Sequence, residues 1–199
     1  MITIRFSLLI LVYLFSQIVF AQVAKTAEDI SPLLIGEKIT SVSIRNLQNE
    51  VVETKNIFNK PTVLIVYRGG WCPYCNTHLA EIGQAQNEIL NLGYQIVAIS
   101  PDNAENLKES VQKHNLGYQL FSDSEGNLSK ILGIAYEAPG LYKGMLSKSS
   151  GGVNESFLPV PAVFVVNTEQ EIEFLFINPN YKKRISKGLL LAVLSNLAK

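Results

Sequence analysis

The segment Trp71-Cys72-Pro73-Tyr74-Cys75 contains the only two cysteines of the chain, separated by two residues. A thiolate, rather than a thiol, attacks a disulfide or a peroxide, so such a pair can form, break or exchange a disulfide once one sulfur is activated. We therefore predict a redox-active pair in which Cys72 attacks and Cys75 resolves the product.

The flanking residues indicate where this pair lies. Residues 62–67 form an apolar, β-branched run typical of a strand buried on both faces, and apolar residues then repeat at helical spacing from Leu79 to Leu92. Cys72 is thus expected at the first turn of a helix, where free amide groups and the helix dipole favour a thiolate. Pro73 suits the first helical position, and Cys75 would lie one turn inward, less exposed.

Three other roles for the cysteines are disfavoured. Haem attachment requires a histidine directly after Cys75, and the chain has Asn76 there. Zinc requires four ligands, and beyond this pair the chain offers only His78 and His114. A structural disulfide that closes a two-residue loop would add little stability. Redox chemistry without a metal or other cofactor is the remaining prediction.

Several nearby residues are candidates for supporting roles. Arg68 either stabilises the thiolate or is simply solvated, and Trp71 and Tyr74 are expected to shape an apolar rim. His78 could assist proton transfer, but a lone histidine on an amphipathic helix is more often a surface residue. Pro161 either begins a strand in the ordinary trans form or holds a cis bond that presents backbone to a substrate.

The order of the other elements predicts a parallel sheet with right-handed crossover helices. The expected strands are residues 39–44, 51–53, 62–67, 95–99, 120–121, 162–166 and 172–176, and the expected later helices are residues 104–114, 128–132 and 184–197. Residues 138–156 are rich in glycine and serine, so we expect a flexible surface loop there, or alternatively a lid beside the site.

Composition and the N-terminus limit the location and the partners. Seventeen basic and seventeen acidic residues leave no net charge that would recruit nucleic acid. Residues 1–21 are expected to be a secretory signal, with an uncleaved membrane anchor as the alternative. Residues 22–34 would be a linker and residues 35–199 a single domain, exported to the periplasm or the extracellular space.

From Ile35 to the C-terminus the chain resembles the AhpC/TSA, or peroxiredoxin-like, branch of the thioredoxin superfamily. The resemblance rests on Leu34-Ile35-Gly36-Glu37-Lys38, Tyr67-Arg68-Gly69-Gly70-Trp71-Cys72-Pro73-Tyr74-Cys75, Val97-Ala98-Ile99-Ser100-Pro101-Asp102, Phe121-Ser122-Asp123 with Leu132-Gly133-Ile134, and Leu158-Pro159-Val160-Pro161-Ala162.

The resemblance implies an α/β thioredoxin-like fold, a central mixed β-sheet flanked by helices. It also implies that Cys72 attacks, that Cys75 resolves by forming a disulfide with Cys72, and that Pro161 is a cis-proline facing them. A thioredoxin-like partner or another dithiol would supply electrons. The sequence predicts no particular oligomeric state.

Three positions depart from related families. Peroxiredoxins usually place threonine or serine three residues before the attacking cysteine and proline four residues earlier, where this chain has Gly69 and Ile65. The hydroxyl that orients a peroxide is therefore missing, and Arg68 is the nearest substitute. Thioredoxins usually carry a buried acid in the preceding strand, where this chain has Val66 or its apolar neighbours.

Three functions follow. The leading hypothesis is an antioxidant enzyme that reduces hydroperoxides through Cys72 and Cys75. The alternative is a thiol-disulfide oxidoreductase that acts on disulfides of exported proteins. The third is a non-catalytic binding module with an inert disulfide, in which the glycine-rich loop contacts a partner.

Overall fold

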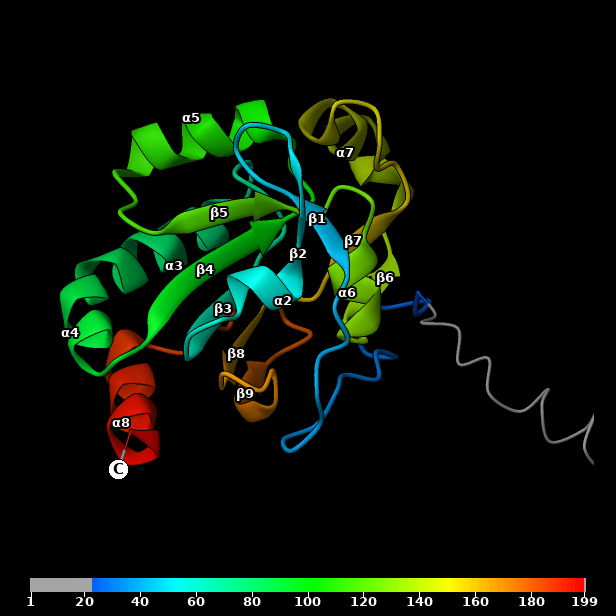
Figure 1. The fold of residues 1–199 in the computed structure, drawn as a ribbon. Helices are drawn as coiled ribbons and strands as arrows, with labels where there is room; N and C mark the ends of the chain where they lie inside the picture. The colour runs from blue at the N-terminus through cyan, green and yellow to red at the C-terminus, as the bar shows by residue number, and fades with distance from the viewer. Residues whose placement is uncertain (1–22, 199) are drawn as a thin grey trace, which may run out of the picture.

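A seven-stranded mixed β-sheet forms the centre of the computed structural model, which describes residues 23–198 (Figure 1). The expected signal at residues 1–21 lies outside the described residues. The strand order is β2-β1-β5-β4-β3-β8-β9. The strands are β1 (Ser43–Arg45), β2 (Val51–Glu53), β3 (Thr62–Val66), β4 (Gln95–Ser100), β5 (Gln119–Ser122), β8 (Ala162–Val166) and β9 (Ile172–Ile177). A separate small sheet pairs β6 (Ala135–Glu137) with β7 (Phe157–Pro159).

The sheet is mixed because only its centre follows the crossover pattern. Strands β3, β4 and β5 are parallel, whereas β8 pairs antiparallel with both β3 and β9. A helical connection returns the chain to the same end of a parallel strand, but the short turn between β8 and β9 reverses its direction. The predicted mixed sheet flanked by helices is confirmed.

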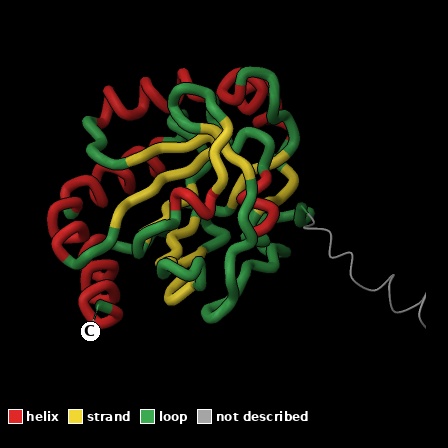
Figure 2. The backbone as a smooth tube through the Cα atoms, in the orientation of Figure 1, coloured by secondary structure: helices red, strands yellow, loops and turns green. Residues whose placement is uncertain are grey.

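Helices cover both faces of the sheet (Figure 2). They are α2 (Thr54–Ile57), α3 (Pro73–Gln84), α4 (Gln86–Asn91), α5 (Ala104–His114), α6 (Asn127–Ile131), α7 (Lys143–Ser150), α8 (Lys187–Leu197) and the 3₁₀ helix η1 (Gly140–Tyr142). Apolar side chains of α3, α4, α5 and α8 share one core cluster, and those of α2 and α6 share the other.

Strand β3 divides these two clusters. Val63 and Ile65 face the first and Leu64 and Val66 the second, and none is more than 2% exposed. Burial on this scale contributes roughly 1.5–3 kcal/mol per side chain, so the strand that leads to the cysteines is firmly held. Tyr67 continues this buried run beyond the end of the strand.

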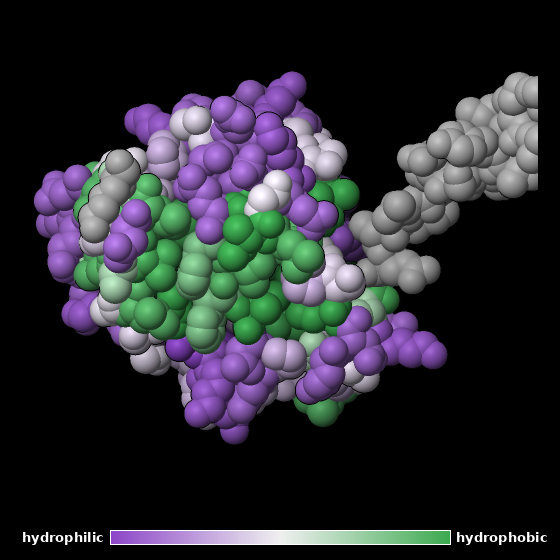
Figure 3. Space-filling model, turned by 90° about the horizontal axis from the view of Figure 1, so that it is seen from below, coloured by the Kyte–Doolittle hydropathy of each residue, from purple (hydrophilic) through white to green (hydrophobic). Residues whose placement is uncertain are grey.

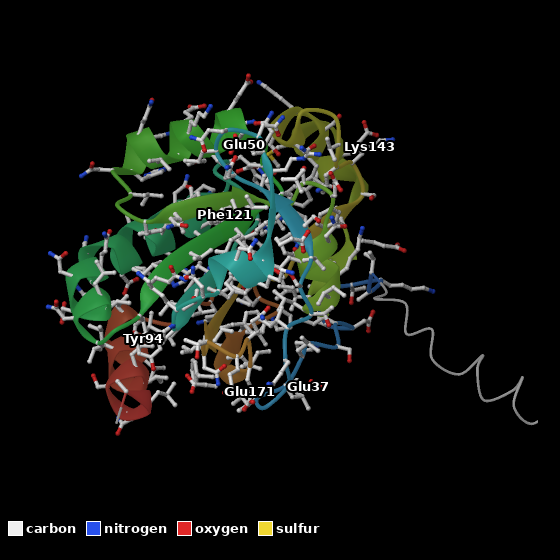
Figure 4. All side chains as sticks on the ribbon, in the orientation of Figure 1. Glu37, Glu50, Tyr94, Phe121, Lys143 and Glu171 are labelled. Carbon is white, nitrogen blue, oxygen red and sulfur yellow. The ribbon has the colours of Figure 1, made fainter. Side chains whose placement is uncertain are left out.

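The N-terminal part of the domain differs from the prediction. Only Ser43 and Ile44 of the expected strand at residues 39–44 belong to a strand, which continues to Arg45, because the preceding residues bond to the turn before β9 instead. The N–H of Ile39 donates to the carbonyl of Gln170 at 2.9 Å, and Figure 4 labels Glu37 and Glu171 close together in this region.

The expected linker also makes contacts with the domain. The N–H of Ala24 donates to the carbonyl of Ala135 at 2.9 Å, and that of Leu33 to the carbonyl of Leu132 at 3.1 Å. Part of this segment is thus attached along β6 and the end of α6.

The prediction that residues 138–156 form a flexible surface loop was wrong. The segment contains η1 and α7, and Leu146 of α7 is fully buried. The carbonyl of Ser149 accepts a bond of 2.9 Å from the N–H of Asn103, and Asn106 donates to the same carbonyl at 2.8 Å. These bonds fix the end of α7 against the start of α5.

Helix α8 begins at Lys187 rather than at the predicted Arg184, because the hydroxyl of Ser186 accepts from the N–H of Leu189 and caps the helix.

Seen from below, the molecule presents a broad apolar band (Figure 3). Leu189 and Leu197 of α8 are exposed. No helix within residues 23–198 is long and apolar enough to cross a membrane.

Candidate active site

Cys72 is the N-cap residue of α3, as predicted. Its backbone is extended, and its carbonyl accepts bonds from the N–H groups of Cys75 at 3.0 Å and Asn76 at 3.1 Å. Pro73 occupies the first helical turn, where its missing N–H has no helical partner. The free amides of this turn therefore surround the Cys72 sulfur with positive potential.

The pKa values of the two cysteines are shifted in opposite directions. A hydrogen bond from Cys75 lowers the pKa of Cys72 to about 6 against the opposing effect of burial, and Arg68 and Arg184 add to the lowering. Burial and the neighbouring Cys72 raise the pKa of Cys75 well above its ordinary value. At neutral pH Cys72 is thus the thiolate and Cys75 the thiol that bonds to it.

Both cysteines are free thiols in this structure. The structure therefore shows the dithiol form of the site, and the disulfide between Cys72 and Cys75 remains a prediction.

Arg68 is buried rather than solvated, which resolves the two alternatives left open for it. Its side chain is 2% exposed, and its guanidinium carbon lies 5.0 Å from the ring centre of Trp71, 4.8 Å from that of Tyr142 and 4.3 Å from that of Tyr181. Aromatic faces stabilise a cation most strongly when it is shielded from water. These rings therefore hold a positive charge beside Cys72.

The same aromatic residues form a rim around the site. Trp71 stacks at a tilt against Tyr142 with ring centres 5.8 Å apart, and Tyr74 meets Tyr181 edge to face at 5.7 Å. The predicted apolar rim of Trp71 and Tyr74 is thus completed by two tyrosines from distant parts of the chain. Tyr74 remains exposed.

The loop before Cys72 is held by Asp102. One carboxylate oxygen of Asp102 accepts from the N–H of Gly70 at 2.6 Å, while the side chain of Asn76 donates to the carbonyl of Gly70 at 2.7 Å. Gly69 has a φ of +140°, and a Cβ atom there would collide with the Trp71 indole and the Asp102 carboxylate. Only glycine fits this backbone.

A pocket of about 340 Å³ lies beside this loop. It is bounded by Gly70, Trp71 and Asp102 on one side and by residues of α5 and α7 on the other. No cluster of three or more potential metal ligands occurs among the residues that the structure describes.

The expectation that His78 is a surface residue was wrong. It is 5% exposed, and burial lowers the pKa of its imidazole to about 4, with the charge of Arg184 acting in the same direction. It lies on the inner side of α3 because residues 181–187 run along that helix, where the N–H of Lys187 donates to Glu81 at 3.0 Å. His78 is therefore neutral at pH 7.

The predicted cis bond before Pro161 was also wrong, since residues 23–198 contain no cis peptide bond. The trans form is the more stable one for a proline, and here the chain continues from β7 into β8 without a tight reversal. Ala162, the first residue of β8, pairs with Val66, the last residue of β3. Pro161 therefore does lie at the end of the sheet where the chain leaves β3 toward Arg68.

The sequence comparison decides the family. A model described as the AhpC/TSA family matches residues 35–175 of this chain. The chain belongs to the AhpC/TSA family. Among its relatives, the putative peroxiredoxin bcp of Haemophilus influenzae is 24% identical over 104 residues, which cover 52% of this chain and 67% of that protein. The putative peroxiredoxin bcp of Helicobacter pylori is 24% identical over 158 residues, covering 79% of this chain and 96% of that protein.

Solved structures of peroxiredoxins have the same fold as this AhpC/TSA-family chain. Reduced Prx3 of Vibrio vulnificus in complex with H₂O₂ has a TM-score of 0.70 at 16% identity, covering 81% of this chain and 99% of that chain. Peroxidoxin BcpB of Mycobacterium tuberculosis has a TM-score of 0.66 at 15% identity, covering 82% and 97% respectively. The predicted thioredoxin-like fold is confirmed. Family and fold together support a thiol-dependent peroxidase function.

Four residues at this AhpC/TSA-family site were not predicted to contribute: Asp102, Tyr142, Tyr181 and Arg184. The Nη2 atom of Arg184 lies 3.5 Å from the sulfur of Cys75, although 108 residues separate them in the chain. Asp102 stands in one of the segments that carry the family resemblance, whereas Tyr142 lies in the glycine-rich stretch and Tyr181 and Arg184 in a Tyr-Lys-Lys-Arg run before the last helix. Neither the stretch nor the run has a spacing that links it to the cysteines.

Proposed function

We propose that the protein is a thiol-dependent peroxidase that reduces hydroperoxides through Cys72. The observation that supports this proposal most directly is the environment of the Cys72 sulfur at the start of α3, where the thiol of Cys75 lowers its pKa to about 6 and the Arg68 charge adds to the lowering. A thiolate that is populated at neutral pH and held beside a cation is the nucleophile that peroxide reduction requires.

The proposed reaction has three steps. The Cys72 thiolate attacks the distal oxygen of the hydroperoxide, the O–O bond breaks, and the alkoxide takes a proton and leaves as an alcohol. Cys72 is then a sulfenic acid, and the Cys75 sulfur attacks it to form a disulfide and release water. An external dithiol finally reduces that disulfide and is itself oxidised.

The electron donor and the location are further parts of the proposal. The family suggests a thioredoxin-like dithiol as the reductant. The apolar segment at residues 1–21 supports export to the periplasm or the extracellular space. An oxidising compartment would then require a dedicated reductant to keep the two thiols reduced.

The alternative function is thiol-disulfide exchange with exported proteins. It is favoured by the residue at position 69, because Gly69 leaves no hydroxyl to orient a peroxide. It is also favoured by the placement of both cysteines within the first turn of α3, a short distance apart for disulfide exchange.

Stopped-flow fluorescence of the reduced protein separates the two functions. Trp71 is the only tryptophan and adjoins Cys72, so its emission should change when Cys72 is oxidised. A rate with hydrogen peroxide or an organic hydroperoxide far above that of a free thiol, lost in Cys72→Ser, would support the peroxidase. A free-thiol rate with both peroxides, together with fast reaction with a disulfide such as oxidised glutathione, would support disulfide exchange.

A further inference from the structure

We infer that Arg184 is a further catalytic residue, which acts on the resolving cysteine: its guanidinium stabilises the Cys75 thiolate when the Cys72–Cys75 disulfide forms and when it is reduced. This inference rests on the proposed redox cycle of the two cysteines. It assigns a step to Arg184 that the peroxide-reducing thiol itself does not need.

The first observation is the contact with the reacting atom. The Nη2 atom of Arg184 lies 3.5 Å from the sulfur of Cys75 and is the donor. Cys75 is 1% exposed, so water cannot solvate a thiolate there. A buried sulfur anion needs a charged or hydrogen-bonding partner, and Arg184 is the cation in contact with it.

The second observation is that the rest of the chain holds Arg184 in this place. Residues 181–187, which we call the strap, run along α3 from Tyr74 to Gln84. Tyr181 contacts Tyr74 at one end, and at the other the N–H of Lys187 donates to Glu81 at 3.0 Å. Between them Ile185 is 1% exposed and fixes the strap in the core. The Nη1 atom of Arg184 also donates to the carbonyl of Lys183 at 3.1 Å, which orients the guanidinium.

The guanidinium groups of the two arginines are placed differently, although both lower the pKa of Cys72 and Arg184 has the smaller effect there. The guanidinium of Arg68 lies among the rings of Trp71, Tyr142 and Tyr181. The guanidinium of Arg184, which belongs to the strap, contacts the sulfur of Cys75. Burial keeps Cys75 a thiol in the reduced enzyme, and Arg184 partly offsets this effect. Cys75 thus stays protonated at rest and yet can lose its proton when Cys72 is oxidised.

The contact between Arg184 and the Cys75 sulfur acts at two steps of the reaction cycle. In resolution, the Cys75 thiol gives up its proton, its sulfur attacks the Cys72 sulfenic acid, and the hydroxyl group leaves with a proton as water. In reduction, an external dithiol attacks Cys72, the Cys72–Cys75 bond breaks, and Cys75 leaves as a thiolate. Arg184 faces the negative sulfur in both cases.

The test compares Arg184→Gln, Arg184→Lys and the neighbouring exposed Lys183→Gln in the mature chain. Sulfenic acid formation and disulfide formation are followed as separate phases by Trp71 fluorescence and by trapping with dimedone and mass spectrometry. We expect R184Q to form the sulfenic acid within about twofold of the parent rate, because Arg184 has the smallest of the effects that lower the pKa of Cys72. Disulfide formation should slow about threefold for each unit by which the Cys75 pKa rises, because the tenfold loss of thiolate is partly offset by its greater nucleophilicity.

The pH profile distinguishes this role from a structural one. The titratable and charged groups that act on Cys75 or are acted on by it are Cys72, Arg68, Tyr67 and Arg184, with His78 one turn along the helix. The midpoint of the resolution rate should move to higher pH in R184Q, return toward the parent in R184K, and stay unchanged in K183Q. Resolution at the parent rate and with the parent pH profile in a folded R184Q would overturn the inference.

A second assay is independent of peroxide. The disulfide form, made with diamide, is reduced by dithiothreitol, and we expect R184Q to be reduced more slowly than the parent and K183Q. If the parent reacts with hydroperoxides no faster than a free thiol, the peroxidase proposal fails, but this assay still tests Arg184. Equal reduction rates for R184Q and the parent would refute the inference even in an active peroxidase.

Discussion

The carboxylate of Asp102, just beyond β4, accepts a hydrogen bond of 2.6 Å from the backbone N–H of Gly70, two residues before Cys72. This single bond couples the second strand of the parallel sheet to the loop that carries the attacking sulfur. Asp102 is 1% exposed, and among the described residues its other oxygen has no hydrogen-bond partner. Its charge is therefore poorly compensated.

The first prediction concerns the stability of Asp102→Asn. Burial raises the pKa of Asp102 from 3.8 to about 6, so the folded state holds its proton more tightly than the unfolded state. The stability contributed by the neutral acid is complete below pH 3.8 and is lost as the pH rises through 6. The asparagine oxygen can still accept from Gly70, so D102N should gain roughly 3 kcal/mol of unfolding free energy over the parent between pH 4 and 7.

Urea denaturation at several pH values measures this difference. The exposed Asp29→Asn serves as the control and should follow the parent curve. If D102N were less stable than the parent, and by the same amount at pH 7 as at pH 4, the buried charge of Asp102 would not be the cost we infer.

The second prediction concerns Gly69. In Gly69→Ala a Cβ atom would collide with Trp71 and Asp102, and alanine would have to adopt a φ of +140°. The free energy of unfolding of this variant should therefore be about 2–4 kcal/mol lower than that of the parent. Gly188→Ala in α8 is the matched control, because a Cβ atom there meets nothing within 4 Å and should stabilise the helix by up to about 1 kcal/mol. Equal effects of the two substitutions in thermal denaturation would contradict this explanation.

Local patterns in the sequence predicted most of the scaffold. The apolar run at residues 62–67 and the helical spacing after Leu79 correctly placed Cys72 at the start of a helix, because both signals depend only on neighbouring residues. The short strand at residues 43–45 and the helix α7 were predicted less well. Their form depends on contacts with the turn before β9 and with α5, which no local pattern encodes.

The surroundings of the cysteines could be predicted only in part. Arg68 and Trp71 were identified because they adjoin the motif, but Tyr142, Tyr181 and Arg184 reach the site through folding of the last third of the chain. The predicted surface position of His78 followed from general frequencies, and it failed because the strap covers that side of α3. Long-range packing, rather than residue type, decides such positions.

The third prediction concerns the acidity of Cys72. The hydrogen bond from Cys75 is the largest influence that lowers its pKa to about 6, so Cys75→Ala should raise that pKa toward the ordinary thiol range near 8.5. The first unit of increase lowers the thiolate fraction at pH 6, and with it the rate of alkylation by iodoacetamide, about fivefold, and each further unit lowers both about tenfold. Arg68→Met should act in the same direction, but less strongly.

Alkylation rates between pH 4 and 9, with thiolate absorbance at 240 nm, give the midpoint for each variant. Cys72→Ala is the control that leaves only Cys75, which should react slowly across this range because burial raises its pKa. A midpoint near 6 that persists in C75A would mean that the helix terminus and the arginines alone activate Cys72.

The last prediction concerns His78, whose effect opposes that of Asp102 in the same pH range. Burial lowers the pKa of His78 from 6.5 to about 4, so the unfolded state binds its proton more tightly. The stability contributed by the neutral imidazole is complete above pH 6.5 and is lost as the pH falls through 4, by roughly 3 kcal/mol. Asp102 contributes the opposite trend, so the contributions of these two groups to the stability of the parent nearly cancel between pH 4 and 6. His78→Gln should therefore become more stable relative to the parent as the pH falls, whereas D102N should become more stable relative to it as the pH rises.

Urea denaturation of both variants tests this, with His114→Gln as the control. If the free energy of unfolding of H78Q differed from that of the parent by the same amount at pH 4 and at pH 7, His78 would not resist protonation in the folded state.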